Sequence, residues 1–327
     1  MLELDSRLAT IYRGALTSHL TGGSPYALLD YPDYTNVGDC AIFLGQLRLL
    51  DQIRIGLPDY ISTFNCSWTL LDKMVPAGPI LLQGGGNFGD LWPRHQEFRL
   101  EVLARYPGRR TIQLPQSIHF SVPEFRDATA RAISAHSNFH LMVRDQKSFE
   151  YSQKHFDCEV ELVPDAAHAL EPVVREPGSG ILTLARADKE RKVHDLRASM
   201  QEYGRVVDWP DDRHARRRVH LGLINTFKAQ LASTRAAAMK ARLDAYHDRA
   251  DERLSAGLAM LTNARVIVSD RLHAHILSEV CGRRHYVLDN SYGKVSSYID
   301  TWGASELTTV VHSLSQLREC LNEHKSD

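Results

Sequence analysis

The chain has 327 residues, which is enough for two domains with cores of their own. Hydrophobic residues make up 43% and charged residues 24%, an ordinary composition for a globular protein that excludes the disordered and fibrous classes. The formal net charge of −1 excludes an overall basic bias toward nucleic acid or an anionic membrane surface.

The cysteines and the N-terminus indicate the compartment. Five cysteines stand singly along the chain, without a Cys-x-x-Cys pair, which favours free thiols in a reducing environment. The first residues are charged and lack the apolar stretch of a signal peptide, and no apolar run approaches the ~18 residues of a spanning helix. We therefore expect a cytoplasmic protein, either free or peripheral to the inner membrane face.

The first half of the chain alternates short apolar runs with helical patterns. Strands are expected at 26–30, 79–83, 110–114, 141–143 and 160–163, with Pro115 ending the third. Helices are expected at about 41–50 and 96–104. This alternation predicts βαβ units and a mostly parallel sheet.

The second half repeats the pattern after a Pro- and Gly-rich linker at 171–180. Strands are expected at 180–184, 205–208, 265–268 and 285–289, long charged helices over 211–260, and a last helix at 304–324. The sequence thus predicts an α/β protein with two domains, residues 1–175 and residues 176–327, facing a cleft. We expect the last helix to pack back on the first domain.

Polar clusters follow the expected strands. They are Asn36 and Asp39, the segment 84–90, Arg144, Asp165, Arg186, the segment 270–275 and the segment 289–294. In open parallel sheets, ligands bind at the carboxyl ends of the strands. The clusters are therefore expected to lie close together in the cleft. That they all follow strands is stronger evidence for a site there than any single motif.

The corner Val268-Ser269-Asp270-Arg271-Leu272-His273-Ala274-His275 joins a strand to a helix. Ser269-Asp270 provides N-cap chemistry, and a helix N-terminus attracts anions. Arg271 adds a guanidinium fork suited to carboxylate or phosphate. His273 adds a group able to transfer a proton near neutral pH, against the alternative of a histidine that only packs.

Two loops of the first half are open to two interpretations each. Gly84-Gly85-Gly86-Asn87-Phe88-Gly89-Asp90 is either a tight turn or a loop whose backbone approaches a ligand. It has neither P-loop nor dinucleotide spacing. Asn36-Val37-Gly38-Asp39 is either a capping turn or a second ligand loop.

Three further features complete the candidate site. Arg144-Asp145 is either a surface pair or the source of a second anion ligand, and Lys294 suits a phosphate contact.

His273 and His275, two positions apart, point to different faces of a helix. No matching ligand set accompanies these histidines, so we predict no metal in this site. A nucleophile elbow of the Gly-x-Ser-x-Gly type is absent, which leaves no basis for a covalent serine mechanism.

These motifs, in this order, resemble the polysaccharide pyruvyl transferase family. The similar elements are Asn36-Val37-Gly38-Asp39, the glycine segment 84–90, Arg144-Asp145 with Ser148, Val163-Pro164-Asp165, and Ser269-Asp270-Arg271-Leu272-His273-Ala274. The resemblance covers about residues 26–300. The helical, charged stretch near 211–260 has no match in it.

The resemblance implies two Rossmann-like domains in a GT-B-like arrangement, with the acceptor on the first domain and the donor signature on the second. It implies phosphoenolpyruvate as donor, a sugar or lipid-linked oligosaccharide as acceptor, a pyruvate ketal as product with release of phosphate, and no cofactor or metal. Arg144 and Arg271 would hold the donor and His273 would be the general acid, with Asp39 or Asp90 as base. The remaining substrate contacts expected are Asn36, Gly85, Gly86, Asn87, Leu272, Ser291 and Lys294.

Two other functions compete with this one. The first is a nucleotide-sugar glycosyltransferase of the same fold, although no clear glutamate for the ribose hydroxyls follows a donor loop. The second is a non-catalytic protein of polysaccharide assembly, against which the Arg271 and His273 pair argues.

Overall fold

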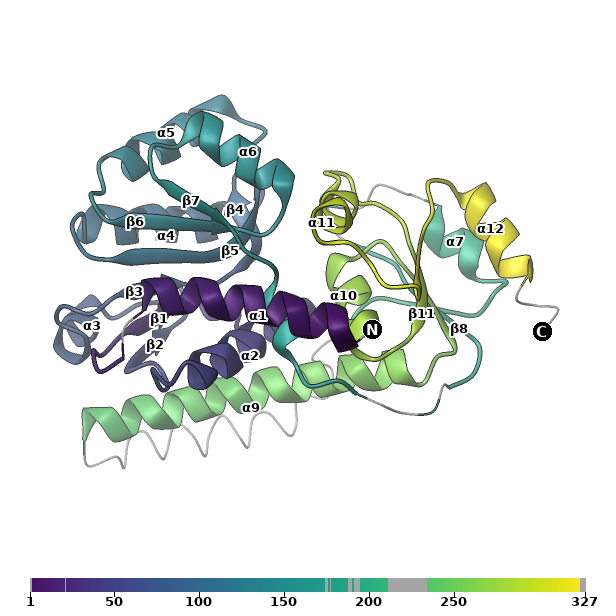
Figure 1. The fold of residues 1–327 in the computed structure, drawn as a ribbon, viewed down its shortest axis with the longest axis horizontal. Coiled ribbons are helices and arrows are strands. Elements are labelled where there is room, and N and C mark those ends of the chain that lie inside the picture. Colours follow the sequence, from purple (N-terminus) through teal and green to yellow (C-terminus); the bar gives the residue numbers. More distant parts are fainter. Residues whose placement is uncertain are drawn as a thin grey trace.

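Two parallel sheets form the framework of the protein (Figure 1). The computed structural model describes residues 2–20, 22–173, 176, 178–187, 190, 195–210 and 234–323. The first sheet has seven strands in the order β2-β1-β3-β5-β6-β7, with β4 pairing beside β5. The second has five strands in the order β12-β11-β10-β8-β9. The expectation of an α/β protein with parallel sheets is confirmed.

The first sheet is built from short apolar runs that are buried on both faces. Leu28 of β1 pairs with Ile61 of β2 on one side and with Leu81 of β3 on the other. Continuous apolar runs of this kind are typical of strands covered by helices on both sides. The strands are β1 Ala27–Leu29, β2 Tyr60–Ser62, β3 Ile80–Leu82, β4 Gly85–Gly89, β5 Thr111–His119, β6 Phe139–Val143 and β7 Glu159–Leu162.

Helices connect these strands and cover the sheet. They are α1 Leu2–His19, α2 Val37–Gln52, α3 Trp68–Met74, α4 Pro93–Arg105, α5 Pro123–Ser134 and α6 Gln146–His155, followed by the 3-10 turn η1 Ala166–Ala169. Helix α1 packs on α2 and η1 and also reaches α10 of the second half. The N-terminal helix therefore contacts elements of both halves.

The second sheet carries the candidate signature on its central strand. Its strands are β8 Ile181–Leu184, β9 Arg205–Val207, β10 Val266–Ser269, β11 Arg284–Val287 and β12 Thr308–Val310. Its helices are α7 Leu196–Met200, α9 Arg235–Thr262, α10 Leu272–Val280, α11 Lys294–Trp302 and α12 Leu314–Glu323. Strand β10 lies between β8 and β11, so the loop that follows it opens at the middle of the sheet edge.

Helix α9 belongs to the second half by sequence and lies along the first half in space (Figure 1). It packs on α2, where Gly257 allows close approach, since a Cβ there would lie 2.4 Å from Val37 Cγ1. Tyr246 stacks on Tyr31 with ring centroids 4.0 Å apart. One core cluster therefore contains Leu28 of the first sheet together with Ile267 of the second.

Several sequence-based expectations were wrong in detail. The third strand continues through Pro115 to His119, with a shift in register between Gln113 and Gln116, the kind of irregularity where a sheet tolerates proline. The glycine segment is itself a strand, β4, and not a loop. Of the long helices expected over 211–260, the part from Arg235 onward is present as α9, and residues 211–233 lie outside the described part of the chain.

The last helix also differs from the expectation. Helix α12 does not return to the first domain, because its apolar residues Leu317 and Leu321 pack with Val268 and Tyr286 of the second sheet. The contacts that join the halves include those of α9 and α10 with α2, of α10 with η1, of α1 with α10 and of α11 with α6.

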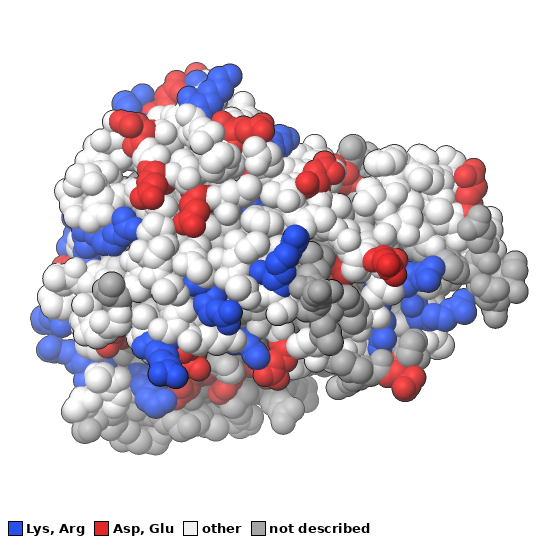
Figure 2. All heavy atoms as spheres, viewed as in Figure 1, with Lys and Arg blue, Asp and Glu red and all other residues white. Residues whose placement is uncertain are grey.

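The surface carries charges of both signs. On the face shown in Figure 2, lysines and arginines are interspersed with acidic residues, in keeping with the net charge of −1. Among the described helices, none combines the length and the apolar character needed to cross a membrane.

Candidate active site

A cavity of about 220 Å³ lies where the carboxyl ends of the two sheets meet. Its cationic lining comes from both halves: Arg144 follows β6, Arg186 follows β8, Arg271 follows β10, and Lys294 follows β11. The expectation that polar residues after the strands converge is met for these side chains. The cavity is therefore suited to an anionic ligand.

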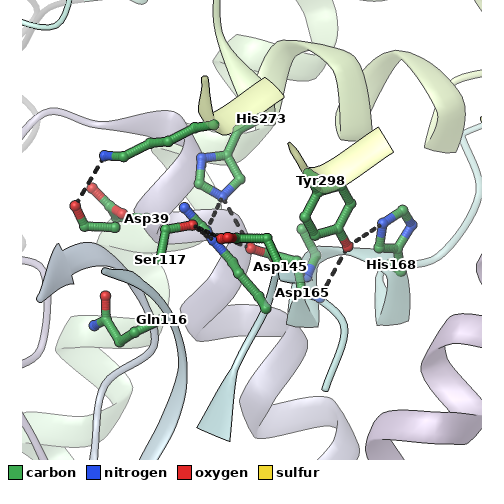
Figure 3. A network of polar contacts seen from close by, with 12 residues as sticks. Asp39, Gln116, Ser117, Asp145, Asp165, His168, His273 and Tyr298 are labelled. Atoms are coloured by element: carbon green, nitrogen blue, oxygen red, sulfur yellow. Dashed lines mark hydrogen bonds and ion pairs between the residues drawn. The ribbon is translucent and has the colours of Figure 1, made fainter. Parts of the chain in front are cut away.

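His273 is held at the wall of this cavity by a buried carboxylate (Figure 3). His273 Nε2 lies 3.4 Å from Asp165 Oδ2, and Arg144 Nη1 donates to the same oxygen at 2.7 Å. Burial would raise the pKa of Asp165, but the hydrogen bond from His273 and the charges of His273 and Arg144 hold it well below its ordinary value. Asp165 is thus an anion that orients both side chains.

Arg144 is fixed on its other side as well. Its Nε donates to Ser117 Oγ at 2.9 Å, and that hydroxyl donates to Asp145 Oδ2 at 2.6 Å (Figure 3). Asp145 in turn caps α6 by accepting from Ser148 N. Arg144 and Asp145 are 2% and 3% exposed, so they are not the surface pair that the sequence allowed. These hydrogen bonds therefore fix the orientation of the Arg144 guanidinium where it lines the cavity.

Gly86 on β4 marks the point where two cations approach the backbone. A Cβ at this position would lie 3.0 Å from Arg144 Nη2 and 3.1 Å from Lys294 Nζ. Lys294 Nζ donates to Gly86 O at 3.2 Å and to Glu190 Oε1 at 3.1 Å. A Cβ here would require both cationic groups to move by a few tenths of an ångström.

Lys294 is buried at the start of α11. Burial lowers its pKa, and the nearby charge of Arg144 acts in the same direction, while the ion pair with Glu190 opposes the shift. Glu190 also accepts from Arg186 Nη2 at 3.0 Å and from Asn290 Nδ2 at 3.2 Å. The Glu190 carboxylate therefore balances part of the positive charge of Lys294 and Arg186.

The α10 corner places the signature as the sequence predicted. Arg271 is the N-cap residue of α10, and Arg271, Leu272 and His273 all line the cavity. Arg271 Nη2 forms an ion pair with Asp208 Oδ1 at 2.5 Å. The expectation that Ser269 or Asp270 caps this helix was wrong, because no side chain among the described residues caps α10. Ser269 Oγ accepts from Arg271 N, and Asp270 accepts from Arg186 N, which follows β8. His275 points away from the cavity and is buried against His285.

The Asn36 loop combines both of its interpretations. The Asn36 side chain caps α2 by accepting from Gly38 N, and its amide nitrogen donates to Asp39 Oδ2 at 2.6 Å. Both Asn36 and Asp39 line the cavity. A capping turn therefore also presents a carboxylate to the site.

Three expected site residues are placed elsewhere. The Asp90 carboxylate accepts from the backbone nitrogens of Ser121 and Val122 at 2.6 Å, where it anchors the loop before α5. Ser291 Oγ donates to Glu190 O. Asp90, Ser291 and Gly85 are not among the residues that line the cavity, whereas Gly86 and Asn87 are.

Several lining side chains are not among those that the sequence predicts. These are Tyr34, Trp92, His95, Glu190 and Trp209. His95 Nδ1 lies 2.9 Å from both oxygens of Asp30, a residue with φ 68° at the end of β1. None of these residues stands in a motif, and only the position of Asp30 directly after an apolar run could have drawn attention to the pair.

Groups able to hold a metal lie away from the cavity. In the part of the chain that the structure describes, two such groups occur, His19 with His140 and Glu161, and His275 with Glu279 and His285. None of these six residues lines the cavity.

Comparison with known proteins now assigns the family. The sequence profile of the family described as Polysaccharide pyruvyl transferase matches residues 36–292, from the Asn36 cap to Tyr292 beside Lys294. The chain belongs to the polysaccharide pyruvyl transferase family. The matched range contains Asp39, Gly86, Arg144, Asp165 and the α10 corner.

Two relatives, one bacterial and one fungal, are similar in sequence to this member of the family over most of its length. EpsO of Bacillus subtilis, whose name assigns it provisionally as a pyruvyl transferase, is 30% identical over 90% of each chain. Pyruvyl transferase 1 of Schizosaccharomyces pombe is 31% identical over 92% of this chain and 74% of its own length.

A solved structure shares the fold. It is an uncharacterized protein of Klebsiella pneumoniae, which covers 94% of this chain and 99% of its own, with a TM-score of 0.58 and 16% identity. At this identity the likeness concerns the fold alone.

Proposed function

We propose that the protein transfers the pyruvyl group of phosphoenolpyruvate to two hydroxyls of one sugar, which forms a ketal and releases phosphate. The observation that carries the proposal is the convergence of Arg144, Arg271 and Lys294 beside a histidine paired with Asp165. Phosphoenolpyruvate has a carboxylate and a phosphate, and guanidinium forks with a helix N-terminus suit both groups. The family supplies the transferase class and the polysaccharide acceptor.

In the proposed reaction, protonated His273 gives its proton to C3 of the enol, which makes C2 electrophilic. One sugar hydroxyl bonds to C2, the bond from C2 to the phosphate oxygen breaks, and the second hydroxyl forms the other C2–O bond. Of the two hydroxyl protons, one restores His273 and the other leaves with phosphate. Asp39 is the proposed base, which accepts the proton that then leaves with phosphate, since Asp39 lines the cavity and Asp90 does not.

A second cavity gives the acceptor room. It adjoins the first and shares Asn36, Trp209 and Arg271 with it. We propose that the sugar enters from this side, and that the two sheets correspond to the GT-B arrangement with the reaction between them.

The five free cysteines fit a cytoplasmic location.

Calorimetric binding of phosphoenolpyruvate, UDP and GDP tests the proposal on the wild type, Arg271→Ala and the control Arg13→Ala, an exposed arginine on α1. We expect phosphoenolpyruvate to bind the wild type and the control, and Arg271→Ala to bind it about 10–100-fold more weakly, the loss of one charge-assisted contact. Each titration is repeated with a sugar acceptor present, and phosphate release is followed in parallel.

The other outcomes separate the competing functions. Binding of UDP or GDP without phosphoenolpyruvate would overturn the proposal in favour of a nucleotide-sugar glycosyltransferase. Donor binding without phosphate release over a broad panel of acceptors would favour a non-catalytic role in polysaccharide assembly.

A further inference from the structure

Two histidines and a glutamate lie together between α10 and β11, away from the cavity. His275 and Glu279 are one turn apart on α10, and His285 faces them from β11. The three residues are 2%, 1% and 1% exposed. Burying polar and charged side chains costs free energy unless they are hydrogen-bonded or paired, so the contacts of each of the three residues must be identified.

The hydrogen bonds of His285 fix its tautomer. Its Nδ1 lies 2.8 Å from Arg283 O, and a carbonyl can only accept, so Nδ1 carries the proton. The lone pair is then on Nε2, which lies 2.8 Å from His275 Nδ1 and 3.0 Å from Thr308 Oγ1. A backbone carbonyl that holds one ring nitrogen so that the other is free to bind is the usual arrangement around metal-ligating histidines.

The carboxylate of Glu279 is only partly satisfied. Its Oε1 accepts from Ser305 N at 3.1 Å and from Thr308 Oγ1. Its Oε2 is buried and has no hydrogen-bond partner among the described residues. A divalent cation would supply the missing positive charge and the missing contact of Oε2.

We propose that His275 Nδ1, His285 Nε2 and the Glu279 carboxylate bind a divalent transition-metal ion of the zinc type. The three ligand atoms lie within 4.8 Å of one another. Tetrahedral zinc at ~2.0–2.1 Å from its ligands needs them about 3.3 Å apart, so the two rings separate by roughly 0.5 Å on binding. The proton of His275 moves from Nδ1 to Nε2, the ring stays neutral, and a water hydrogen-bonded to Thr308 completes the coordination.

A second cluster of the same composition does not have the right tautomer. Arg110 Nη2 donates to His19 Nδ1 at 2.6 Å, so the proton of His19 is on Nε2. That nitrogen donates to Glu161 Oε2 at 2.9 Å and therefore has no lone pair for a metal. The His19, His140 and Glu161 cluster is thus a hydrogen-bonded network, and it serves as the control.

The proposed ion would have a structural role in this pyruvyl transferase. It would join α10 to β11, and the N-terminus of α10 carries Arg271 and His273. The sequence predicts no metal near His273, because the spacing of His273 and His275 matches no ligand set, and the pairing of His275 with Glu279 and His285 appears only in the fold. The role of the ion in stability is independent of the donor chemistry proposed above.

Cobalt and zinc binding to the full chain, produced without a histidine tag, tests the proposal. We expect the wild type, treated with chelator and dialysed, to bind one equivalent of Co²⁺ with the visible spectrum of a tetrahedral site, and Zn²⁺ to displace it. Glu279→Gln and His285→Gln should weaken Co²⁺ binding at least about tenfold. Glu161→Gln, in the control cluster, should bind as the wild type does. Zn²⁺ should raise the melting temperature of the wild type and of Glu161→Gln only.

Either of two results would overturn the proposal. One is a wild type that shows no tetrahedral Co²⁺ spectrum and no Zn²⁺-dependent rise in melting temperature. The other is binding that Glu161→Gln reduces as much as Glu279→Gln does. Glu279→Gln preserves shape and removes a buried charge, so we expect it to fold without metal. If it does not, His285→Gln makes the same comparison.

Discussion

A methyl group added at Gly38 would lie 2.2 Å from His273 Nδ1. The first turn of α2, from the first half of the chain, thus touches the imidazole that α10 of the second half presents. This contact and the Asp165 carboxylate hold the ring from two sides. The position of the proposed acid therefore depends on residues from three separate parts of the sequence.

Gly38→Ala should accordingly displace His273 and lower kcat by about 10²–10⁴-fold, the usual worth of positioned acid catalysis. Steady-state phosphate release measures the change. Gly14→Ala on α1 is the matched control, because a Cβ there meets nothing within 4 Å. Equal activity of both variants would show that the ring does not act where the structure places it.

His273→Ala should lower kcat by a similar factor and leave the affinity for phosphoenolpyruvate nearly unchanged, because the donor is held by the arginines. Calorimetry and phosphate release on the same preparation separate the two effects. Full turnover in this variant would remove His273 from the mechanism.

Asp165→Asn should destabilise the protein and change its response to acid. The pKa of Asp165 is held well below its ordinary value, so its carboxylate stabilises the fold above pH ~4 and this contribution is lost as the pH falls toward the folded-state pKa. The variant leaves Arg144 buried without its partner, a loss of about 3–5 kcal/mol near pH 7. Thermal melting from pH 7 to pH 3 should show a smaller decline for the variant; parallel curves would contradict this.

Lys294 should make donor binding sensitive to alkaline pH. Burial lowers its pKa, so the ammonium loses its proton at a lower pH than an exposed lysine does. The affinity for phosphoenolpyruvate should weaken as the pH rises through this range. Lys294→Arg, which stays charged, should bind the donor with little pH dependence over the same range. Calorimetric titrations at several pH values check this, and identical profiles would exclude a donor contact by Lys294.

Leu254→Ala tests how α9 supports the first half. Leu254 is 5% exposed in the core shared by both sheets, and a buried leucine truncated to alanine costs about 2–5 kcal/mol. The free energy of unfolding in urea measures the loss. Lys240→Ala on the exposed face of α9 should change it by less than about 0.5 kcal/mol.

The sequence predicts the framework and the positive side of the site well. Apolar runs located most strands, and the rule that ligands bind after parallel strands brought Arg144, Arg271 and Lys294 together. It could not separate Asp39 from Asp90, because both follow similar turns and only packing shows which one faces the cavity. Glu190 and Trp209 stand in no pattern. Strands β2 (Tyr-Ile-Ser) and β12 (Thr-Thr-Val) contain polar residues and do not form the apolar runs that located the other short strands.

Helix α9 has a consequence for anyone who recombines members of this family. At 28 residues it is about 42 Å long, and it is encoded after the linker while it packs on α2, encoded before it. A chimaera joined in the linker would combine the α9 of one parent with the α2 of another. The pair Gly257 and Val37 would then have to match across parents, so exchanges of acceptor specificity should cross over on either side of α9 and not at the boundary between the sheets.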